Sequence, residues 1–135
     1  MGYESKVYIV ERNEFPKRDT WPSYISAIVL AEYDLANTGW RMDEFHSAFK
    51  RDIDYKLWLP TCDADGNEIM GEVDTDPYGE HMKAADLPDL ISALETIEAR
   101  EHYRRIPPLL AMLKAINLDE WTDSTGRIEA VHYGH

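Results

Sequence analysis

An alternating run followed by a turn dipeptide constrains the fold of this chain more than any other segment. Residues 52–60 place four apolar side chains on one face of an extended chain, namely Ile53, Tyr55, Leu57 and Leu59. A repeat of two residues is typical of a half-buried β-strand. The Asp65-Gly66 dipeptide that follows favours a tight hairpin turn, with Glu68 to Val73 as the returning strand. The sequence therefore predicts an antiparallel hairpin.

Two strands are expected before this hairpin. Residues 3–11 are rich in β-branched and aromatic side chains, and residues 13–22, which contain two prolines, are expected to form a loop. The apolar spacing in residues 24–35 would also suit a helix, but their β-branched centre favours a second strand. A short helix is expected at 40–49, because Asp43 and Glu44 stand in its first turn, where the helix dipole favours anions.

The segments after the hairpin predict one short strand, two helices and a last strand. Proline and glycine at the second and fourth positions of residues 76–79 favour a type I turn, which allows a strand at 81–85. Asp86 is a candidate N-cap for a helix with one apolar stripe, formed by Leu87, Leu90, Ile91, Leu94 and Ile97. Pro107-Pro108 breaks this run, so a second helix is expected at 108–117, and a turn near 123–126 leads into a strand at 127–133.

These elements predict a single α+β domain over residues 1–135. We expect an antiparallel β-meander of about four to six strands, with a C-terminal helix pair packed on one face. In this interpretation an acidic hairpin region spans 61–86, the helix pair spans about 87–117, and a C-terminal turn and strand span 118–135. A chain of this length buries enough surface to fold without disulfides or metals.

The charge and the apolar content exclude several classes of protein. A net charge of −12 disfavours direct binding to nucleic acid, which depends on lysine and arginine replacing counterions. The longest strongly apolar run, near 107–116, is about half the roughly twenty residues that cross a bilayer, so we expect no membrane segment. A single cysteine, Cys62, and no signal-peptide pattern indicate a cytoplasmic protein.

More than half of the net charge lies in the acidic hairpin region. Residues 61–86 contain eight acidic and one basic side chain, a net charge of −7. Trp58 lies on the strand face opposite the apolar side chains, where tryptophan could anchor an interface. We therefore predict a partner-binding site that consists of Asp63, Asp65, Glu68, Glu72, Asp74, Asp76, Glu80 and Trp58. The alternative is a pair of acidic turns that only keep the protein soluble.

Metal and catalytic signatures are weak throughout the chain. Residues 61–72 resemble a calcium loop in part, but Thr61 replaces its first ligand and a strand precedes it in place of a helix. His132 and His135 stand near the end of the chain, and His46 and His81 are isolated, so these histidines predict no metal site. Acidic neighbours disfavour a reactive thiolate at Cys62. We expect a non-enzymatic protein without metal or cofactor.

Two motifs resemble small uncharacterised bacteriophage accessory proteins. These are the opening Tyr3-Glu4-Ser5-Lys6-Val7-Tyr8-Ile9-Val10 and the Asp76-Pro77-Tyr78-Gly79-Glu80 stretch before a leucine-rich helix, together about a third of the chain. The resemblance implies a phage or prophage protein that works in the bacterial host cytoplasm. Small acidic phage proteins are commonly inhibitors of host defence, including anti-CRISPR and anti-restriction factors, and some of them mimic nucleic acid.

Three functions therefore stand as hypotheses. The first is an inhibitor whose acidic region binds a basic surface of a host defence or nucleic-acid-binding protein. The second is a sponge for a defence nucleotide signal, which would use Arg41, Lys50, Arg51, Arg104 and Arg105 at the interface of a homodimer. The third is a structural phage protein that forms a stable oligomer.

Overall fold

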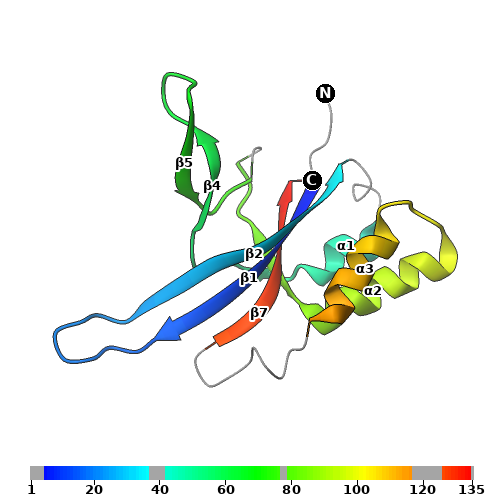
Figure 1. Cartoon of the computed structure of the whole chain (residues 1–135), viewed down its shortest axis with the longest axis horizontal. Helices are drawn as coiled ribbons and strands as arrows, with labels where there is room; N and C mark the ends of the chain where they lie inside the picture. Colours follow the sequence, from blue (N-terminus) through cyan, green and yellow to red (C-terminus); the bar gives the residue numbers. More distant parts are fainter. Residues whose placement is uncertain (1–4, 37–41, 77–78, 117–125, 135) are drawn as a thin grey trace.

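A computed structural model describes residues 5–36, 42–76, 79–116 and 126–134 of the chain. These residues form seven strands and three helices: β1 (Ser5–Phe15), β2 (Tyr24–Ala36), α1 (Asp43–Ala48), β3 (Arg51–Asp52), β4 (Leu57–Cys62), β5 (Glu68–Val73), β6 (Lys83–Asp86), α2 (Leu87–Arg100), α3 (Ile106–Ala115) and β7 (Gly126–Gly134). All of the paired strands are antiparallel. The predicted α+β class is confirmed (Figure 1).

The last strand of the chain lies in the middle of the main sheet. Its strand order is β2-β1-β7-β6-β3, while β4 and β5 form a separate two-stranded sheet. The strand predicted at 127–133 is therefore present, and it joins the N-terminal hairpin β1–β2 to β6. Folding of the sheet thus requires contact between the two ends of the chain, since Ser5 pairs with Gly134.

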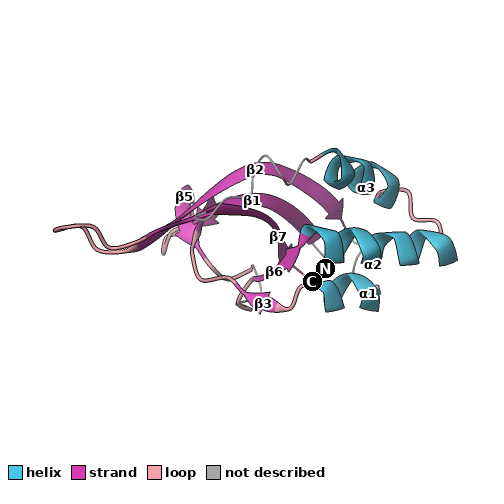
Figure 2. Ribbon diagram, turned by 90° about the horizontal axis from the view of Figure 1, so that it is seen from below, coloured by secondary structure: helices cyan, strands magenta, loops and turns pink. Residues whose placement is uncertain are grey.

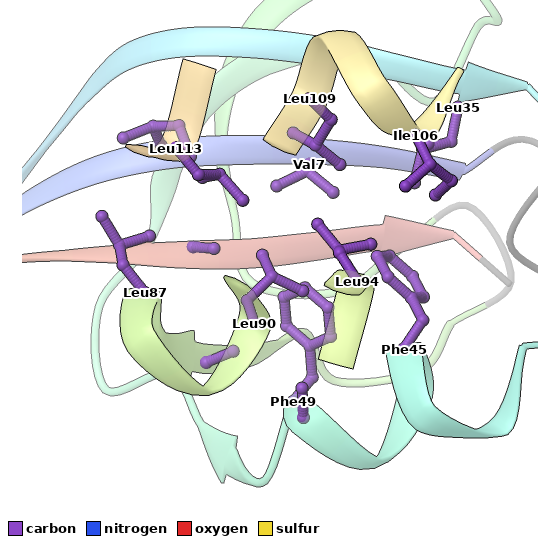
Figure 3. Packing of buried hydrophobic residues seen from close by; sticks show 14 of the residues in the cluster. Val7, Leu35, Phe45, Phe49, Leu87, Leu90, Leu94, Ile106, Leu109 and Leu113 are labelled. Carbon is purple, nitrogen blue, oxygen red and sulfur yellow. The ribbon is translucent and has the colours of Figure 1, made fainter. Parts of the chain in front are cut away.

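The helices cover one face of the main sheet, as Figure 2 shows. The core on this side combines Val7, Ile9 and Leu35 from the sheet with apolar side chains from all three helices. In Figure 3, Phe45 of α1 and Phe49, the residue after this helix, point toward Leu94 and Leu90 of α2. The predicted packing of the C-terminal helix pair on one face is confirmed, and α1 is added to the same layer.

The two long helices begin where the sequence provides a suitable first turn. In α2, Asp86 is the N-cap residue as predicted, although its carboxylate binds Arg51 and makes no capping bond. Helix α3 begins at Ile106 with Pro107 and Pro108 in its first turn, where the missing amide hydrogens are not needed. The break predicted at the two prolines therefore lies just before them, in residues 101–105.

Residues 52–60 do not form the single strand that was predicted. Their apolar side chains are buried as expected, but β3 ends at Asp52 and β4 begins at Leu57. The four residues between them, which we call the strap, cross the sheet face opposite the helices. Ile53, Tyr55, Leu57 and Leu59 pack there against Tyr8 and Val10 of β1, among other side chains. The strand is interrupted because the strap is bonded to the main sheet.

A change of face within β2 explains its ambiguous sequence pattern. On the face covered by the strap, β2 contributes Ile25, Ala27 and Val29. On the face covered by the helices, it contributes Tyr33 and Leu35. All of these positions are odd-numbered, so a regular strand would place them on one face. The register shifts between Ile9 and Val10, where Leu30 has no partner, and this bulge turns the following residues to the other face.

A buried carboxylate holds the strap on the sheet. Glu129 of β7 is 1% exposed, and its Oε1 accepts hydrogen bonds from Arg127 Nε at 2.8 Å and from Arg51 Nη1 at 3.2 Å. Its Oε2 accepts a hydrogen bond from the Tyr55 hydroxyl. Asp54, next in the strap, forms a two-point ion pair with Arg12 at 3.1 and 2.6 Å. These bonds set the direction in which the chain leaves the sheet toward β4.

Tyr55 should make the protein sensitive to alkaline pH. Burial, and after it the bond to Glu129, raises the pKa of Tyr55 well above its usual value. The protonated phenol is therefore favoured in the folded state, and its stabilising effect is complete below the unfolded pKa of about 10 and is lost as the pH rises above it. Between pH 9 and 11, about one unit either side of that pKa, we expect the free energy of unfolding of the wild type to fall more than that of Tyr55→Phe. Urea unfolding at each pH measures this difference. Parallel pH profiles would contradict this assignment.

Candidate functional site

The hairpin β4–β5 is buried on one face near its base and exposed on the other. Directly paired residues share a face, and the pairs Leu57–Val73 and Leu59–Gly71 face the main body, where the two leucines are buried. The pair Thr61–Ile69 lies on the same face nearer the turn, and Ile69 is 44% exposed. The opposite face is exposed throughout and consists of Trp58, Pro60, Cys62, Glu68, Met70 and Glu72. We call these six residues the outer face. The predicted turn at Asp65-Gly66 is present, with Gly66 at φ 86°.

The seven predicted acidic residues fall into three groups along the hairpin. Asp63 and Asp65 stand in the turn, Glu68 and Glu72 lie on the outer face, and the remaining three follow β5, namely Asp74, Asp76 and Glu80. Glu72 pairs directly with Trp58, which is 60% exposed. The structure thus brings Glu68, Glu72 and Trp58 onto one face and places the other five acids in the turn of the hairpin or after its second strand.

Asp63 stabilises the turn. Its Oδ1 accepts hydrogen bonds from the amides of Asp65 and Asn67, each at 2.9 Å. These backbone bonds, that of Asn67 first, lower the pKa of Asp63. This is the usual way in which aspartate orders a turn, and it leaves Asp63 less available to a partner than its neighbours.

Asp76 has a similar role at the other end of the hairpin. Its Oδ1 accepts a hydrogen bond from the Glu80 amide at 3.0 Å, and its carbonyl accepts one from the Gly79 amide at 3.1 Å. The second bond is the one expected of the predicted turn at 76–79, whose central residues Pro77 and Tyr78 lie outside the described part of the chain.

Four of the seven predicted acids form no ion pair with a basic residue in the described part of the chain. Among residues 5–36, 42–76, 79–116 and 126–134, no ion pair involves Asp65, Glu68, Glu72 or Glu80. Carboxylates elsewhere are paired, for example that of Glu44 with Arg100 and that of Asp54 with Arg12. The negative charge of the hairpin is therefore available to an external partner.

The basic residues expected for nucleotide binding are partly engaged within the fold. Arg51 pairs with Asp86 and Glu129, and Arg105 donates a hydrogen bond to the Asp34 carbonyl at 2.8 Å. Lys50 and Arg104 are exposed, and Arg41 lies outside the described residues. The geometry therefore leaves Lys50 and Arg104 as the described members of this set without an internal partner.

Three histidines that predicted no metal site, His46, His81 and His132, line one pocket of about 290 Å³. They come, in that order, from α1, from the segment before β6 and from β7, and the polar lining also includes Asp76, Glu80 and Lys83. His132 Nε2 lies 2.8 Å from Ser5 Oγ, so this residue belongs to the sheet and not to a frayed end of the chain. Because these residues are far apart in the sequence, no spacing rule could have grouped them. Within the described ranges, no three histidine, cysteine or acidic residues are arranged to hold a metal ion, at this pocket or in the calcium-like segment.

Sequence reasoning also missed the exposure of Trp21. Trp58 was the tryptophan assigned to the candidate site and is exposed, but Trp21, which was assigned to no site, is 70% exposed. Trp40 and Trp121 lie outside the described residues. The loop composition of residues 13–22 was the available signal, because the tip of a loop lies away from the core.

Comparisons with known proteins give no relative for this site. No family model, no curated protein and no solved structure matches the chain. In the part of the chain that the structure describes, no helix is both long and apolar enough to span a membrane.

Proposed function

We propose that the protein is a non-enzymatic inhibitor whose β4–β5 hairpin binds a basic surface of a host protein. The observation that supports this proposal is an exposed sheet face on which unpaired carboxylates flank apolar side chains. Glu68 and Glu72 lie at either end of this face, with Pro60 and Met70 between them and Trp58 beside Glu72. Exposed tryptophan next to charge is a frequent centre of protein interfaces.

The spacing of the two carboxylates favours a protein surface as the target. Glu72 follows Glu68 by four positions along the strand, about 13 Å at a rise of roughly 3.3 Å per residue. The phosphates of one DNA strand follow one another at about 3.4 Å along the axis, so the outer face is much less densely charged than a nucleic acid. A mimic of nucleic acid is accordingly the less favoured form of this proposal. A target protein whose basic side chains are spaced around an apolar pocket would be more complementary to the outer face than a site built for nucleic acid.

The host-defence setting is the second part of the proposal, and the resemblance to phage accessory proteins supports it. A net charge of −12 would accelerate encounter with a basic target at low salt. The targets that best combine exposed basic surface with a role in defence are nucleic-acid-binding proteins of the bacterial cytoplasm, such as CRISPR or restriction enzymes. The protein would occupy their basic surface and so block it.

The experiment is affinity capture from bacterial host lysate with wild-type protein and a variant in which Asp65, Glu68, Glu72 and Glu80 are changed to lysine. We expect the wild type to retain a host protein at low salt and to release it at high salt, and we expect the variant to retain none. A matched control changes Asp52, Asp89, Glu95 and Glu101 to lysine, four exposed acids outside the hairpin. Both variants change the net charge by the same amount.

The control separates a local site from a general effect of charge. Equal loss of capture in both variants would show that only net charge matters and would refute the hairpin site. Unchanged capture by the hairpin variant would refute the proposal outright. Circular dichroism spectra that match the wild type are required for both variants.

A further inference from the structure

The β1–β2 hairpin extends beyond the rest of the sheet. The last pair between β1 and β7 is Asn13–Gly126, so from Glu14 onward β1 pairs only with β2. We call residues 14–25 the arm, and Figures 1 and 2 show it projecting away from the helices and from β4–β5. A two-stranded ribbon is only marginally stable by itself, so the arm needs local contacts to be ordered.

The tip of the arm has such contacts. Arg18 and Trp21 exchange two backbone hydrogen bonds, of 3.1 and 2.7 Å, which close the turn. The rings of Phe15 and Tyr24, a directly opposed pair, stack with centroids 4.7 Å apart. These contacts order the tip but leave Trp21 70% exposed, so stability of the arm does not account for this tryptophan.

The tip is hollowed into a pocket of about 480 Å³. Its lining consists of Phe15, Pro16, Arg18, Trp21, Pro22 and Tyr24. A pocket of this size and apolar character accepts a single large side chain or a small ligand. Tryptophan, tyrosine and arginine are the residues most enriched among interface hot spots, and all three are present.

The charge at the tip is opposite to that of the protein as a whole. Lys17 and Arg18 are adjacent and exposed, and neither forms an ion pair with another described residue. Together with the exposed Asp19 that follows them, these two residues give the turn a net charge of +1 on a chain of net charge −12. Charge complementarity indicates a ligand with anionic groups next to its apolar part.

An exposed apolar row leads from the pocket toward the body of the protein. Tyr24 and Ile28 share one face of β2, and Leu30 follows at the bulge, with all three side chains exposed. Leu30 follows Tyr24 by six positions, so the row is about 20 Å long at a rise of roughly 3.3 Å per residue. A nucleotide could use the rings and cations of the tip but not this row. An extended peptide could use all three features.

We propose that the arm is a second binding site, which takes an extended peptide of another protein. Apolar side chains of the peptide lie along Ile28 and Tyr24, one of them enters the pocket beside Trp21, and acidic residues beyond it meet Lys17 and Arg18. This site is separate from the acidic hairpin and binds the opposite charge. One molecule could therefore bridge a basic surface and an acidic segment.

The test is selection of binders from a library of random linear peptides on the intact protein, followed by affinity measurement of the enriched peptides by fluorescence polarisation. We expect enriched peptides to place aspartate or glutamate beside an apolar residue. Trp21→Ala should weaken them at least about tenfold, as expected for a hot spot. The double variant Lys17→Glu, Arg18→Glu should select peptides with basic residues in place of acidic ones. Trp21 is mostly exposed, so its replacement should not impair folding.

The control variant Lys50→Glu, Arg104→Glu changes the net charge equally at two exposed basic residues outside the arm. It should retain the original peptides with unchanged affinity. Failure to enrich any peptide, or equal weakening in the control variant, would overturn the proposal. Tight binding of adenosine monophosphate or of a short single-stranded oligonucleotide, lost in Trp21→Ala, would assign the pocket to nucleobases instead. None of these results depends on whether the acidic hairpin binds a host protein.

Discussion

Replacing Glu129 with alanine should destabilise the protein by about 3–5 kcal/mol, because two arginines and a tyrosine would lose their shared partner. Glu129 lies at the centre of the main sheet and is 1% exposed. Its carboxylate accepts hydrogen bonds from Arg51, Arg127 and Tyr55, so its removal leaves the buried Tyr55 hydroxyl without an acceptor. A small domain has only about 5–15 kcal/mol of total stability, so this loss is large.

Urea unfolding followed by tryptophan fluorescence and far-ultraviolet circular dichroism measures this effect. Glu95→Ala is the matched control, because Glu95 is exposed and its ion pair with Lys114, at 3.7 Å, is a surface pair worth less than about 1 kcal/mol. Glu129→Gln, which keeps the shape and one acceptor oxygen, should lie between the two. A loss below about 1 kcal/mol in Glu129→Ala would mean that water replaces the carboxylate and that the network does not hold the strap.

The role of Glu129 shows what the sequence alone could not reveal. In β7, Arg127 and Glu129 alternate with Ile128 and Ala130, a pattern that normally marks one polar, solvated face. That face is buried because the strap, more than seventy residues earlier in the chain, crosses it. The covering segment and the arginines come from other elements, and periodicity within one strand carries no information about them.

Local patterns did predict the features that depend on neighbouring residues. The alternation of residues 53–59 correctly assigned buried and exposed faces, and with the Asp65-Gly66 turn it placed Trp58 on the exposed face of a hairpin. The prediction of one continuous strand over residues 52–60 was wrong, because side-chain bonds from Tyr55 and Asp54 to the main sheet interrupt it. The same distinction applies to the candidate site: the pairing of Glu72 with Trp58 follows from the hairpin register, whereas the histidine pocket depends on tertiary contacts.

Helix α1 provides the other large expected effect, because it is too short to be stable without its packing. It has six residues, and isolated helices shorter than about twelve residues are marginal in water. Phe45 is fully buried, and its ring centroid lies 5.1 Å from those of Phe49 and His132. As Figure 3 shows, it also points toward Leu94 of α2, so this side chain attaches α1 to both the sheet and the helix layer.

Phe45→Ala should therefore destabilise the protein by about 3–5 kcal/mol, since it removes a large buried side chain and leaves a cavity. Ser47→Ala, at an exposed position of the same helix, is the control and should change stability by less than about 0.5 kcal/mol. Hydrogen exchange should show faster exchange of the His46 amide, which donates a hydrogen bond to the Met42 carbonyl at 3.1 Å. Because Phe45 borders His46 and His132, loss of α1 should also open the histidine pocket. Unchanged protection of the His46 amide in Phe45→Ala would show that α1 is held by its other contacts and that the pocket does not depend on this ring.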